Sequence, residues 1–387
     1  MTIDPWVDGR IDALNEYLIA AGVLSPSSPE SRFWRGTLNR VPRHLFVPRR
    51  AWMQPQDDRE EGLIDRDTDP AFWYHTVYSN TALITQRGDG TADVADRSGP
   101  PTSSTSSPHV VFEFLRLLNP QDEHRVLEIG TGTGWTAALL AERVGDSQVT
   151  TVEVDKSIAE VAAENLKAAD YGPTLLVGDG ALGAPDHAPY DRVHVTCGVR
   201  DIPYAWVEQA RPGAVIVMPW MPAHGGWGQR LRLDVLDDGT AEGSFHGTCK
   251  YMMMRAQRPE AWPPYPDDGV NGTTWVDPRE PWNALDEGFG LHLAIVAPNL
   301  TITTAGWEGQ EDASSAWVMR LRDIAHRDAW ANITARPGQD AQVSQSGGRQ
   351  LWHTMEATYM EWLRAGRPGP GAYRMTVTPR RQDVWLR

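Results

Sequence analysis

A strand, a glycine-rich turn and a helix follow one another in the stretch VLEIGTGTGW, Val126 to Trp135. Gly130, Gly132 and Gly134 allow the backbone to approach a ligand closely, at the point where the next helix directs its free N–H groups. A turn of this kind is typical of α/β proteins that bind a ligand at the carboxyl edge of a parallel sheet. The chain should therefore contain such a sheet.

The block from 109 to 221 alternates short apolar runs with amphipathic stretches, which indicates a parallel sheet covered on both faces. The strands expected here are RVLEIG, QVTTVEV, TLLVGD, DRVHVTC and AVIVMPW, and the helices are 134–144, 156–168 and AWVEQAR. Two further runs, RLRLDVL and KYMMMRAQ, alternate around a Gly-containing turn and predict an antiparallel hairpin at the edge of the sheet.

The remaining chain divides around this block. Residues 1–108 read as a helical entry segment followed by a polar insertion, and 109–257 as the ligand-binding core. The stretch 258–272 has the composition of a linker. Residues 273–387 suggest a smaller C-terminal α+β domain, with LHLAIVAP as a strand, 349–364 as a helix, and YRMTVTP and DVWLR as closing strands.

Charge and cysteine content narrow the class of protein. The net charge of -15 argues against a wide nucleic-acid-binding face, which needs clustered Lys and Arg. With only two cysteines and no apolar run of membrane length, we expect a cytoplasmic protein without a membrane partner. We also expect no metal site: DRDTDP resembles a calcium loop, but Pro70 and Thr76 stand where that loop needs Gly and Glu.

Two later strand ends add chemistry to the glycine turn. Glu153, at the end of VEVD, is placed to accept hydrogen bonds from the hydroxyls of a ribose, and Asp179 with Gly180 follows the next strand. The alternative is that these residues only make tight turns. Three consecutive turns with this chemistry favour a nucleotide-like ligand.

At this point the sequence resembles the protein L-isoaspartyl O-methyltransferases. VLEIGTGTGW, VEVD, VGDGALGAPDHAPYDRVHVT and IPYAWVEQARPGAVIVMP carry the resemblance, which extends upstream through VPRHLFVP and VYSNTALITQ. It implies a Rossmann-like class I methyltransferase that binds S-adenosyl-L-methionine and releases S-adenosyl-L-homocysteine. The implied cofactor-binding residues are Glu128, Gly130, Thr131, Gly132, Gly134, Glu153, Val154, Asp179 and Gly180.

The resemblance also assigns a role to SSTSSPH. Ser106 falls on the family's active-site serine, with Ser107 and His109 beside it, although Ser103, Ser104 and Ser107 are near enough to compete. About thirty polar residues separate this stretch from VPRHLFVP, where the repair enzymes of the family have a short connection. His109 is alternatively a helix-capping or surface residue, and Cys197 is expected to be buried rather than nucleophilic.

Residues 273–387 carry eight tryptophans, which suggests recognition of a substrate or, alternatively, a stability or dimerisation module. It resembles extended homologues that esterify an aspartyl carboxylate in ribosomally made, macrocyclised peptides such as graspetides and lanthipeptides, giving aspartimide or isoaspartate. We therefore expect a peptide-tailoring methyltransferase. General isoaspartate repair, a non-catalytic cofactor-binding partner protein and a small-molecule carboxylate substrate remain open.

Overall fold

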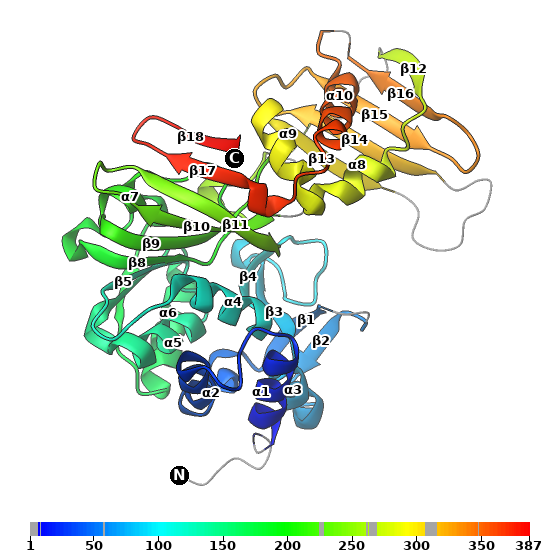
Figure 1. Cartoon of the computed structure of the whole chain (residues 1–387). Helices are drawn as coiled ribbons and strands as arrows, with labels where there is room; N and C mark the ends of the chain where they lie inside the picture. Colours follow the sequence, from blue (N-terminus) through cyan, green and yellow to red (C-terminus); the bar gives the residue numbers. More distant parts are fainter. Residues whose placement is uncertain are drawn as a thin grey trace. The chain divides into compact units, whose positions relative to one another are not determined.

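The computed structural model of the chain describes residues 7, 9–56, 59–223, 228–260, 262, 269–305, 316–346 and 348–387. The chain forms two compact units (Figure 1). Unit 1 comprises Met1–Cys197 and Pro203–Met218, and unit 2 comprises Gly198–Ile202 and Pro219–Arg387.

Unit 1 contains the predicted parallel sheet. Its strands lie in the order β9 (Ala210–Trp220), β8 (Tyr190–Val195), β5 (Val126–Ile129), β6 (Val149–Glu153) and β7 (Thr174–Val177). All four neighbouring pairs are parallel. Helices α5 (Trp135–Val144), α6 (Lys156–Ala168) and the short α7 (Ala205–Glu208) follow β5, β6 and β8, which confirms the predicted alternation. The Rossmann-like α/β fold is therefore present.

The N-terminal part of unit 1 is more ordered than its polar composition suggested. Helices α1 (Arg10–Ala20), α2 (Pro29–Arg40) and α3 (Pro70–Val77) accompany an antiparallel sheet in the order β2-β1-β3-β4. Its strands are β1 (Arg50–Pro55), β2 (Gly62–Asp65), β3 (Thr81–Arg87) and β4 (Pro101–Thr105). The 3-10 turn η1 (Arg43–Phe46) lies in VPRHLFVP, and α4 (Pro108–Leu118) follows β4.

The stretch WYHTVYSNTALITQ is divided between α3 and β3. Its first half belongs to α3, because Asp69 accepts a hydrogen bond from Phe72 N at 2.9 Å and Pro70 stands at the first helical position. DRDTDP therefore ends in a helix cap, and its Asp67 pairs with Arg49. Nowhere in the described part of the chain do three His, Cys, Asp or Glu side chains gather as metal ligands would.

The antiparallel hairpin is present, but its second strand was misplaced. β10 (Gly228–Val235) pairs with β11 (Ala241–Cys249), and KYMMMRAQ begins only after β11 ends. The turn explains the difference: Asp238 Oδ1 accepts a hydrogen bond from Thr240 N at 3.0 Å, and Gly239 has φ +80°. A turn this tight returns the chain immediately. β11 pairs in turn with β17 (Tyr373–Val377), and β17 with β18 (Gln382–Leu386).

Unit 2 also contains an antiparallel five-stranded sheet in the order β12-β16-β15-β14-β13. These strands are β12 (Val270–Thr274), β13 (Leu300–Ala305), β14 (Trp317–Asp323), β15 (Trp330–Ala335) and β16 (Ala341–Gln345). Helices α8 (Arg279–Ala284), α9 (Gly290–Val296) and α10 (Leu351–Arg364) accompany the sheet, and α10 packs on β14, β15 and β16. The C-terminal part is therefore α+β, as expected.

One prediction in this region is wrong. LHLAIVAP was expected to be a strand, but its residues form most of α9, with Leu291 and Leu293 buried. A short apolar run does not distinguish a strand from a buried helix by periodicity alone.

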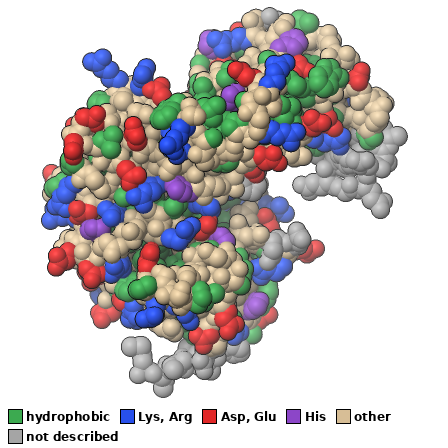
Figure 2. Space-filling view, in the orientation of Figure 1, with side chains coloured by type: hydrophobic (Ala, Val, Ile, Leu, Met, Phe, Trp, Pro, Cys, Tyr) green, Lys and Arg blue, Asp and Glu red, His purple; other side chains and the backbone are tan. Residues whose placement is uncertain are grey.

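The predicted linker 258–272 lies partly outside the described residues, and the predicted domain boundaries stay a prediction. None of the helices in the described ranges combines the length and apolarity needed to cross a bilayer. Acidic and basic side chains are interspersed over the face drawn in Figure 2, so the net charge of -15 is not gathered there.

Candidate functional site

The carboxyl ends of four parallel strands of unit 1 lie level with one another. Gly130 N donates to Val152 O at 2.8 Å, Gly178 N to Glu153 O at 2.9 Å and Thr196 N to Ile129 O at 2.9 Å. These bonds bring the residues after β5, β6, β7 and β8 to one edge of the sheet. In a parallel α/β sheet this edge is where ligands bind.

The glycine turn after β5 adopts a backbone that side chains would oppose. Gly130, Gly132 and Gly134 have φ of +92°, +55° and +93°. A Cβ on Gly130 would lie 2.6 Å from Thr196 Oγ1, and one on Gly134 would lie 3.2 Å from Leu166 Cγ. The first helical residue of α5, Trp135, follows immediately, so the turn presents the N-terminus of α5 at the sheet edge.

Glu153 lies beside this turn, as the sequence predicted. Its Oε2 accepts a hydrogen bond from Gly132 N at 2.9 Å and its Oε1 accepts one from Asp155 N at 3.0 Å. Each carboxylate oxygen can accept more than one hydrogen bond, so acceptor capacity remains for the hydroxyls of a ribose. The carboxylate is thus fixed next to the glycine turn by backbone N–H groups.

Asp179 and Gly180 lie at the next position along the edge. Asp179 Oδ1 accepts from Ala181 N at 2.9 Å, and a Cβ on Gly180 would lie 2.6 Å from Ile129 Cγ2. Three large apolar side chains near these strand ends are exposed: Val154 (45%), Val177 (55%) and Leu182 (67%). Apolar side chains left open at a binding edge suit a flat, apolar ring.

Glu128 and Thr131, both predicted to bind the cofactor, are buried. Glu128 Oε2 accepts from Thr151 Oγ1 at 2.7 Å, and Thr151 Oγ1 lies 2.6 Å from Thr131 Oγ1. Glu128 Oε1 lies 3.8 Å from His194 Nδ1. This buried row joins β5, β6 and the glycine turn, so it supports the turn from beneath rather than lining the edge.

The Ser/Thr stretch is a strand in direct contact with the glycine turn. Its residues form β4, which pairs with β3. Thr105 Oγ1 lies 3.0 Å from Thr133 Oγ1, and a Cβ on Gly132 would lie 3.6 Å from Ser104 O. In the same sheet, Gln86 Nε2 donates to Asp155 Oδ2 at 3.3 Å. The polar composition therefore marks an element that contacts the site and not a spacer.

Ser106 lies at the corner between β4 and α4, and its side chain is partly exposed. Within the described residues, no hydrogen-bond partner exists for its hydroxyl, so the hydroxyl is available to a substrate. Ser107 is buried and precedes the first residue of α4. His109 N donates to Asn80 Oδ1 at 3.2 Å, and His109 Nε2 lies 3.6 Å from Glu113 Oε2. Ser106 and His109 thus flank the start of one helix.

Cys197 follows β8 at the same edge; the residue is partly exposed, and so less buried than expected, although its thiol group is enclosed. Burial of the thiol group raises its pKa to about 12, and the nearby Glu153 carboxylate adds to the shift. A thiol with so high a pKa is protonated at neutral pH and is a poor nucleophile. The expectation that Cys197 does not act as a nucleophile agrees with this environment.

Sequence reasoning did not single out Thr196 or Arg43 as parts of the site. Thr196 Oγ1 donates to Gly130 O at 2.5 Å and to Ile129 O at 3.0 Å, and so holds the glycine turn from β8. Its position at the end of a predicted parallel strand was a usable signal. Arg43 lies within VPRHLFVP, but its contacts are far apart in the sequence, so no local pattern indicated them.

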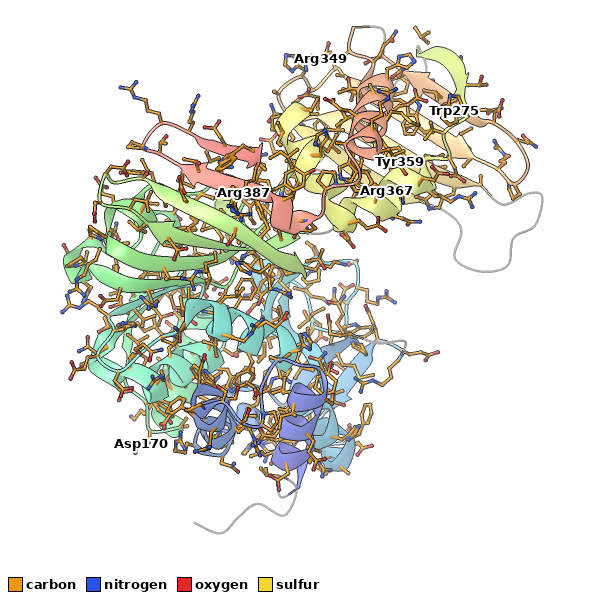
Figure 3. All side chains as sticks on the ribbon, in the orientation of Figure 1. Asp170, Trp275, Arg349, Tyr359, Arg367 and Arg387 are labelled. Atoms are coloured by element: carbon orange, nitrogen blue, oxygen red, sulfur yellow. The ribbon has the colours of Figure 1, made fainter. Side chains whose placement is uncertain are left out.

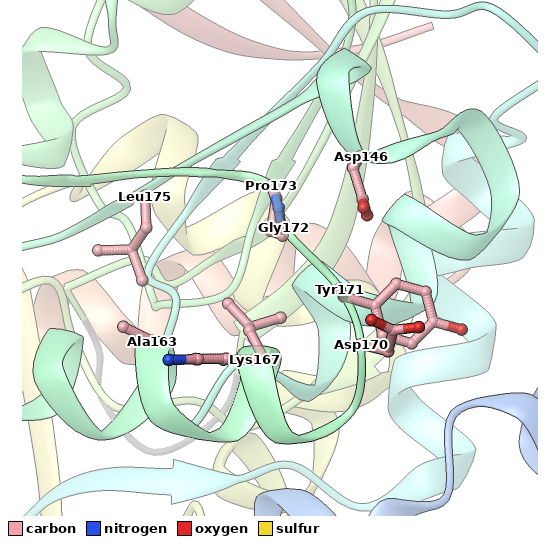
Figure 4. Close-up of a pocket in the computed structure, with 9 residues that line it drawn as sticks. Asp146, Ala163, Lys167, Asp170, Tyr171, Gly172, Pro173 and Leu175 are labelled. Carbon is pink, nitrogen blue, oxygen red and sulfur yellow. The ribbon is translucent and has the colours of Figure 1, made fainter.

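A separate cleft of about 490 Å³ lies at the opposite end of β7 (Figure 4). Its lining includes Asp146, Lys167, Tyr171 and Leu175, which belong to segments that precede β7 or begin it. Because β7 runs parallel to β6, this cleft lies away from the edge that carries Glu153. It is not part of the site.

The groups along the edge are N–H groups of a helix start, a fixed carboxylate and exposed apolar side chains, in that order. Together they suit a ligand with a polar end, a hydroxylated sugar and a flat ring. Thr105 and Ser104 of β4 lie against the polar end of this series. A second reactant held by Ser106 would therefore meet the polar end of the ligand.

The family model and the relatives that match this chain belong to the same family. The model of the family described as Protein-L-isoaspartate(D-aspartate) O-methyltransferase (PCMT) matches residues 64–257. A Methanopyrus kandleri protein-L-isoaspartate O-methyltransferase is 36% identical over 219 residues, covering 56% of this chain and 80% of that protein. The corresponding Thermococcus onnurineus protein is 37% identical over 157 residues, covering 40% of this chain and 70% of its own length.

Solved structures include a chain titled protein-L-isoaspartate O-methyltransferase with a TM-score of 0.53 and 16% identity. It covers 97% of this chain and 99% of its own length. At this identity the likeness concerns the fold alone. It nevertheless extends over nearly all of the chain, unit 2 included.

Proposed function

The chain belongs to the protein-L-isoaspartate(D-aspartate) O-methyltransferase family, and on that premise we propose that it transfers a methyl group from S-adenosyl-L-methionine to a side-chain carboxylate of an isoaspartyl or aspartyl residue. One observation carries this proposal. The serine strand β4 lies directly against the glycine turn, through Thr105 and Thr133 and through Ser104 and Gly132. The cofactor edge and the carboxylate-holding corner are therefore one site.

The residues along the edge fit the proposed cofactor. The glycine turn would hold its methionine part, Glu153 its ribose hydroxyls, and Asp179 with Gly180 its adenine, next to Val154, Val177 and Leu182. When bound, S-adenosyl-L-methionine supplies an electrophilic methyl group and leaves as S-adenosyl-L-homocysteine. The glycine at 130 is required here, since Thr196 leaves no room for a side chain at that position.

The chain's own residues have little chemistry to perform on the acceptor. A carboxylate is deprotonated at neutral pH and needs no general base, so its position and orientation decide the rate. The Ser106 hydroxyl would donate a hydrogen bond to one carboxylate oxygen and leave the other facing the methyl group. After transfer, the backbone amide nitrogen of the following residue can attack the ester carbonyl carbon, and methoxide leaves with the amide proton as methanol, so a five-membered imide closes. Methanol leaves more readily than water would from the free acid.

The finer proposal is that the acceptor is an aspartyl residue of a macrocyclised ribosomal peptide. Two features of this chain support it: the polar insertion between VPRHLFVP and SSTSSPH, and unit 2. Several tryptophans of unit 2 are enclosed: Trp330, Trp352 and Trp362 are buried, and Trp282 and Trp317 pack partly buried against the core. Trp275, labelled in Figure 3, is 77% exposed and is the clearest candidate for contact with a peptide. Trp307 lies outside the described residues.

General isoaspartate repair has an observation in its favour as well. The solved chain titled protein-L-isoaspartate O-methyltransferase shares the fold over 97% of this chain, so a chain of this length is not peculiar to tailoring enzymes. The two substrate classes differ in what surrounds the acceptor. Repair requires only an isoaspartyl residue in any flexible peptide, whereas tailoring requires one constrained peptide.

Competition between the two substrates separates these functions. The full chain is incubated with S-adenosyl-L-methionine and equal amounts of a linear isoaspartyl peptide and a macrocyclised aspartyl precursor, and mass spectrometry follows both products. Tailoring predicts a kcat/KM at least about a hundredfold higher for the cyclised peptide. Repair predicts the reverse order. Binding of the cofactor without transfer to either peptide would instead favour a non-catalytic partner protein.

A further inference from the structure

Arg43 is a fully buried cation. Its side chain in η1 is 0% exposed, and within the described residues no carboxylate pairs with it. Burial lowers the pKa of the Arg43 guanidinium to about 9, while the nearby Tyr78 acts in the opposite direction. The group is therefore still charged at neutral pH. A buried charge persists only where its donors find strong acceptors.

Those acceptors are backbone carbonyls from three elements. Arg43 Nη1 donates to Val77 O at 2.5 Å, at the end of α3, and Nη2 donates to Thr81 O at 2.9 Å, at the start of β3. Nη2 also donates to Thr105 O at 3.2 Å and to Ser106 O at 2.9 Å. The last two carbonyls belong to the corner that carries Ser106. One side chain thus ties this corner to α3 and β3.

The same guanidinium also contacts the cofactor edge. Its Cζ lies 5.1 Å from the ring centroid of Trp135, the first residue of α5 after the glycine turn. The Trp135 Nε1 donates to Val41 O at 3.4 Å, two residues before Arg43. A cation over an aromatic face is attracted to it. Arg43 therefore contacts both the serine corner and Trp135, the residue that follows the glycine turn.

Lysine cannot reproduce this arrangement. The planar guanidinium distributes its N–H donors over carbonyls in several directions, whereas an ammonium is a compact point charge. A lysine here loses part of the planar donor arrangement, and burial lowers the pKa of its ammonium group as well. Arg43→Lys therefore weakens the hold on the Thr105 and Ser106 carbonyls through both geometry and charge.

We propose that Arg43 is a positioning residue: it fixes the backbone of residues 105 and 106 so that the Ser106 hydroxyl meets the acceptor carboxylate beside the glycine turn. The inference rests on the proposed methyl transfer to a carboxylate. Arg43 itself, fully buried behind the corner, does not touch the substrate and acts through Ser106.

A double-mutant cycle tests this inference. Arg43→Lys, Ser106→Ala and the double variant are compared with the wild type for kcat, KM and cofactor dissociation constant. We expect Arg43→Lys to lower kcat about tenfold or more with the cofactor constant changed less than about threefold, and the double variant to be no slower than Ser106→Ala. A double variant whose kcat falls by the product of the two single reductions would overturn the inference. Arg40→Lys, in the neighbouring helix and half-exposed, is the matched control.

Hydrogen exchange gives a readout that does not depend on turnover. In Arg43→Lys, amides of residues 101–110 should exchange about tenfold faster while α5 and β5 keep their rates. If that variant does not fold, the wild type alone still decides: amides of residues 106–109 exchanging at the rate of an unstructured chain would overturn the inference. If the wild type transfers no methyl group, the proposed function is contradicted. The hydrogen-exchange measurement still tests whether Arg43 fixes the backbone of residues 105 and 106.

Discussion

At the scale of single residues, Ser106 has the surroundings that a carboxylate-holding side chain needs. Its hydroxyl is available among the described residues, and its carbonyl is fixed by Arg43 at 2.9 Å. Ser103, by contrast, is buried and accepts a hydrogen bond from Thr85 Oγ1 at 3.1 Å. Of the serines that could compete for the role, Ser103 is therefore already engaged within the sheet.

Ser106→Ala should depress methyl transfer and leave the cofactor dissociation constant nearly unchanged. The loss of one hydrogen bond to a charged group corresponds to about a ten- to hundredfold lower kcat/KM. Ser104→Ala, two residues earlier in β4, is the control and should retain transfer within about threefold. Steady-state kinetics with calorimetric titration of the cofactor measures both quantities. Unchanged transfer in Ser106→Ala would assign the carboxylate to another group.

Cys197 should be inert towards alkylating reagents while the protein is folded. Because burial raises its pKa from 9.0 to about 12, the folded protein holds far less thiolate at pH 8.5 than the unfolded chain does. Labelling by iodoacetamide should be at least about a hundredfold slower in the native protein than in urea. Fast native labelling at pH 8.5 would show that the thiol is not in the environment described here.

At the scale of elements, the glycine turn is the part whose backbone determines cofactor binding. Gly130 and Gly145 have the same φ of +92°, but only Gly130 faces a neighbour, Thr196 Oγ1, at 2.6 Å from an added Cβ. An added Cβ on Gly145 meets nothing within 4 Å. Comparison of an alanine substitution at each of these positions separates the effect of backbone strain from that of a steric conflict in the site.

Gly130→Ala and Gly145→Ala form a matched pair. Each should lower the free energy of unfolding by about 1–3 kcal/mol through backbone strain. Only Gly130→Ala should also weaken binding of S-adenosyl-L-homocysteine, by about a hundredfold or more, because the turn must shift away from Thr196. Chemical denaturation and calorimetric titration check the two effects. Equal cofactor affinity in both variants would contradict the assignment of the turn.

The elements that the sequence predicted well are those whose signal is local. VLEIGTGTGW, the strand ends at Glu153 and Asp179, and the helices of the core depend on patterns within ten or so residues. The polar composition of SSTSS gives no local signal for a strand, yet this stretch contributes to β4 by pairing with β3 and by contact with Thr133. Partners distant in the sequence decide that structure. The contacts of Arg43 escaped prediction for the same reason.

At the scale of the whole molecule, the question is what unit 2 contributes. Its five-stranded sheet and α10 enclose a core that includes Phe289, Trp352, Tyr359 and Trp362. These aromatic residues stabilise the unit by burial, so the high tryptophan content of the tail does not in itself indicate recognition. Trp275 and Trp385 remain exposed, at 77% and 39%.

Trp275→Ala should raise KM for a constrained peptide several-fold and leave kcat and the melting temperature unchanged, because an exposed ring contributes to contact and not to the core. Trp385→Ala is the matched control, since the Trp385 Nε1 already donates to Thr376 Oγ1 at 3.0 Å. Kinetics and thermal unfolding of both variants make the comparison. Equal KM values for all three proteins would leave unit 2 with a stabilising role.

If this chain esterifies a carboxylate, the methyl group that it transfers is held as an ester, which mild base cleaves. The wild-type chain is incubated with S-adenosyl-L-methionine carrying a labelled methyl group and with the linear and cyclised peptides, and the products are then treated with mild base. If the product is a carboxylate ester, one of the peptides carries the label. Mild base then releases this label as methanol, and imide formation removes it in the same form. Label that stays on the peptide through base treatment, or no label on either peptide although the cofactor binds, would contradict the account.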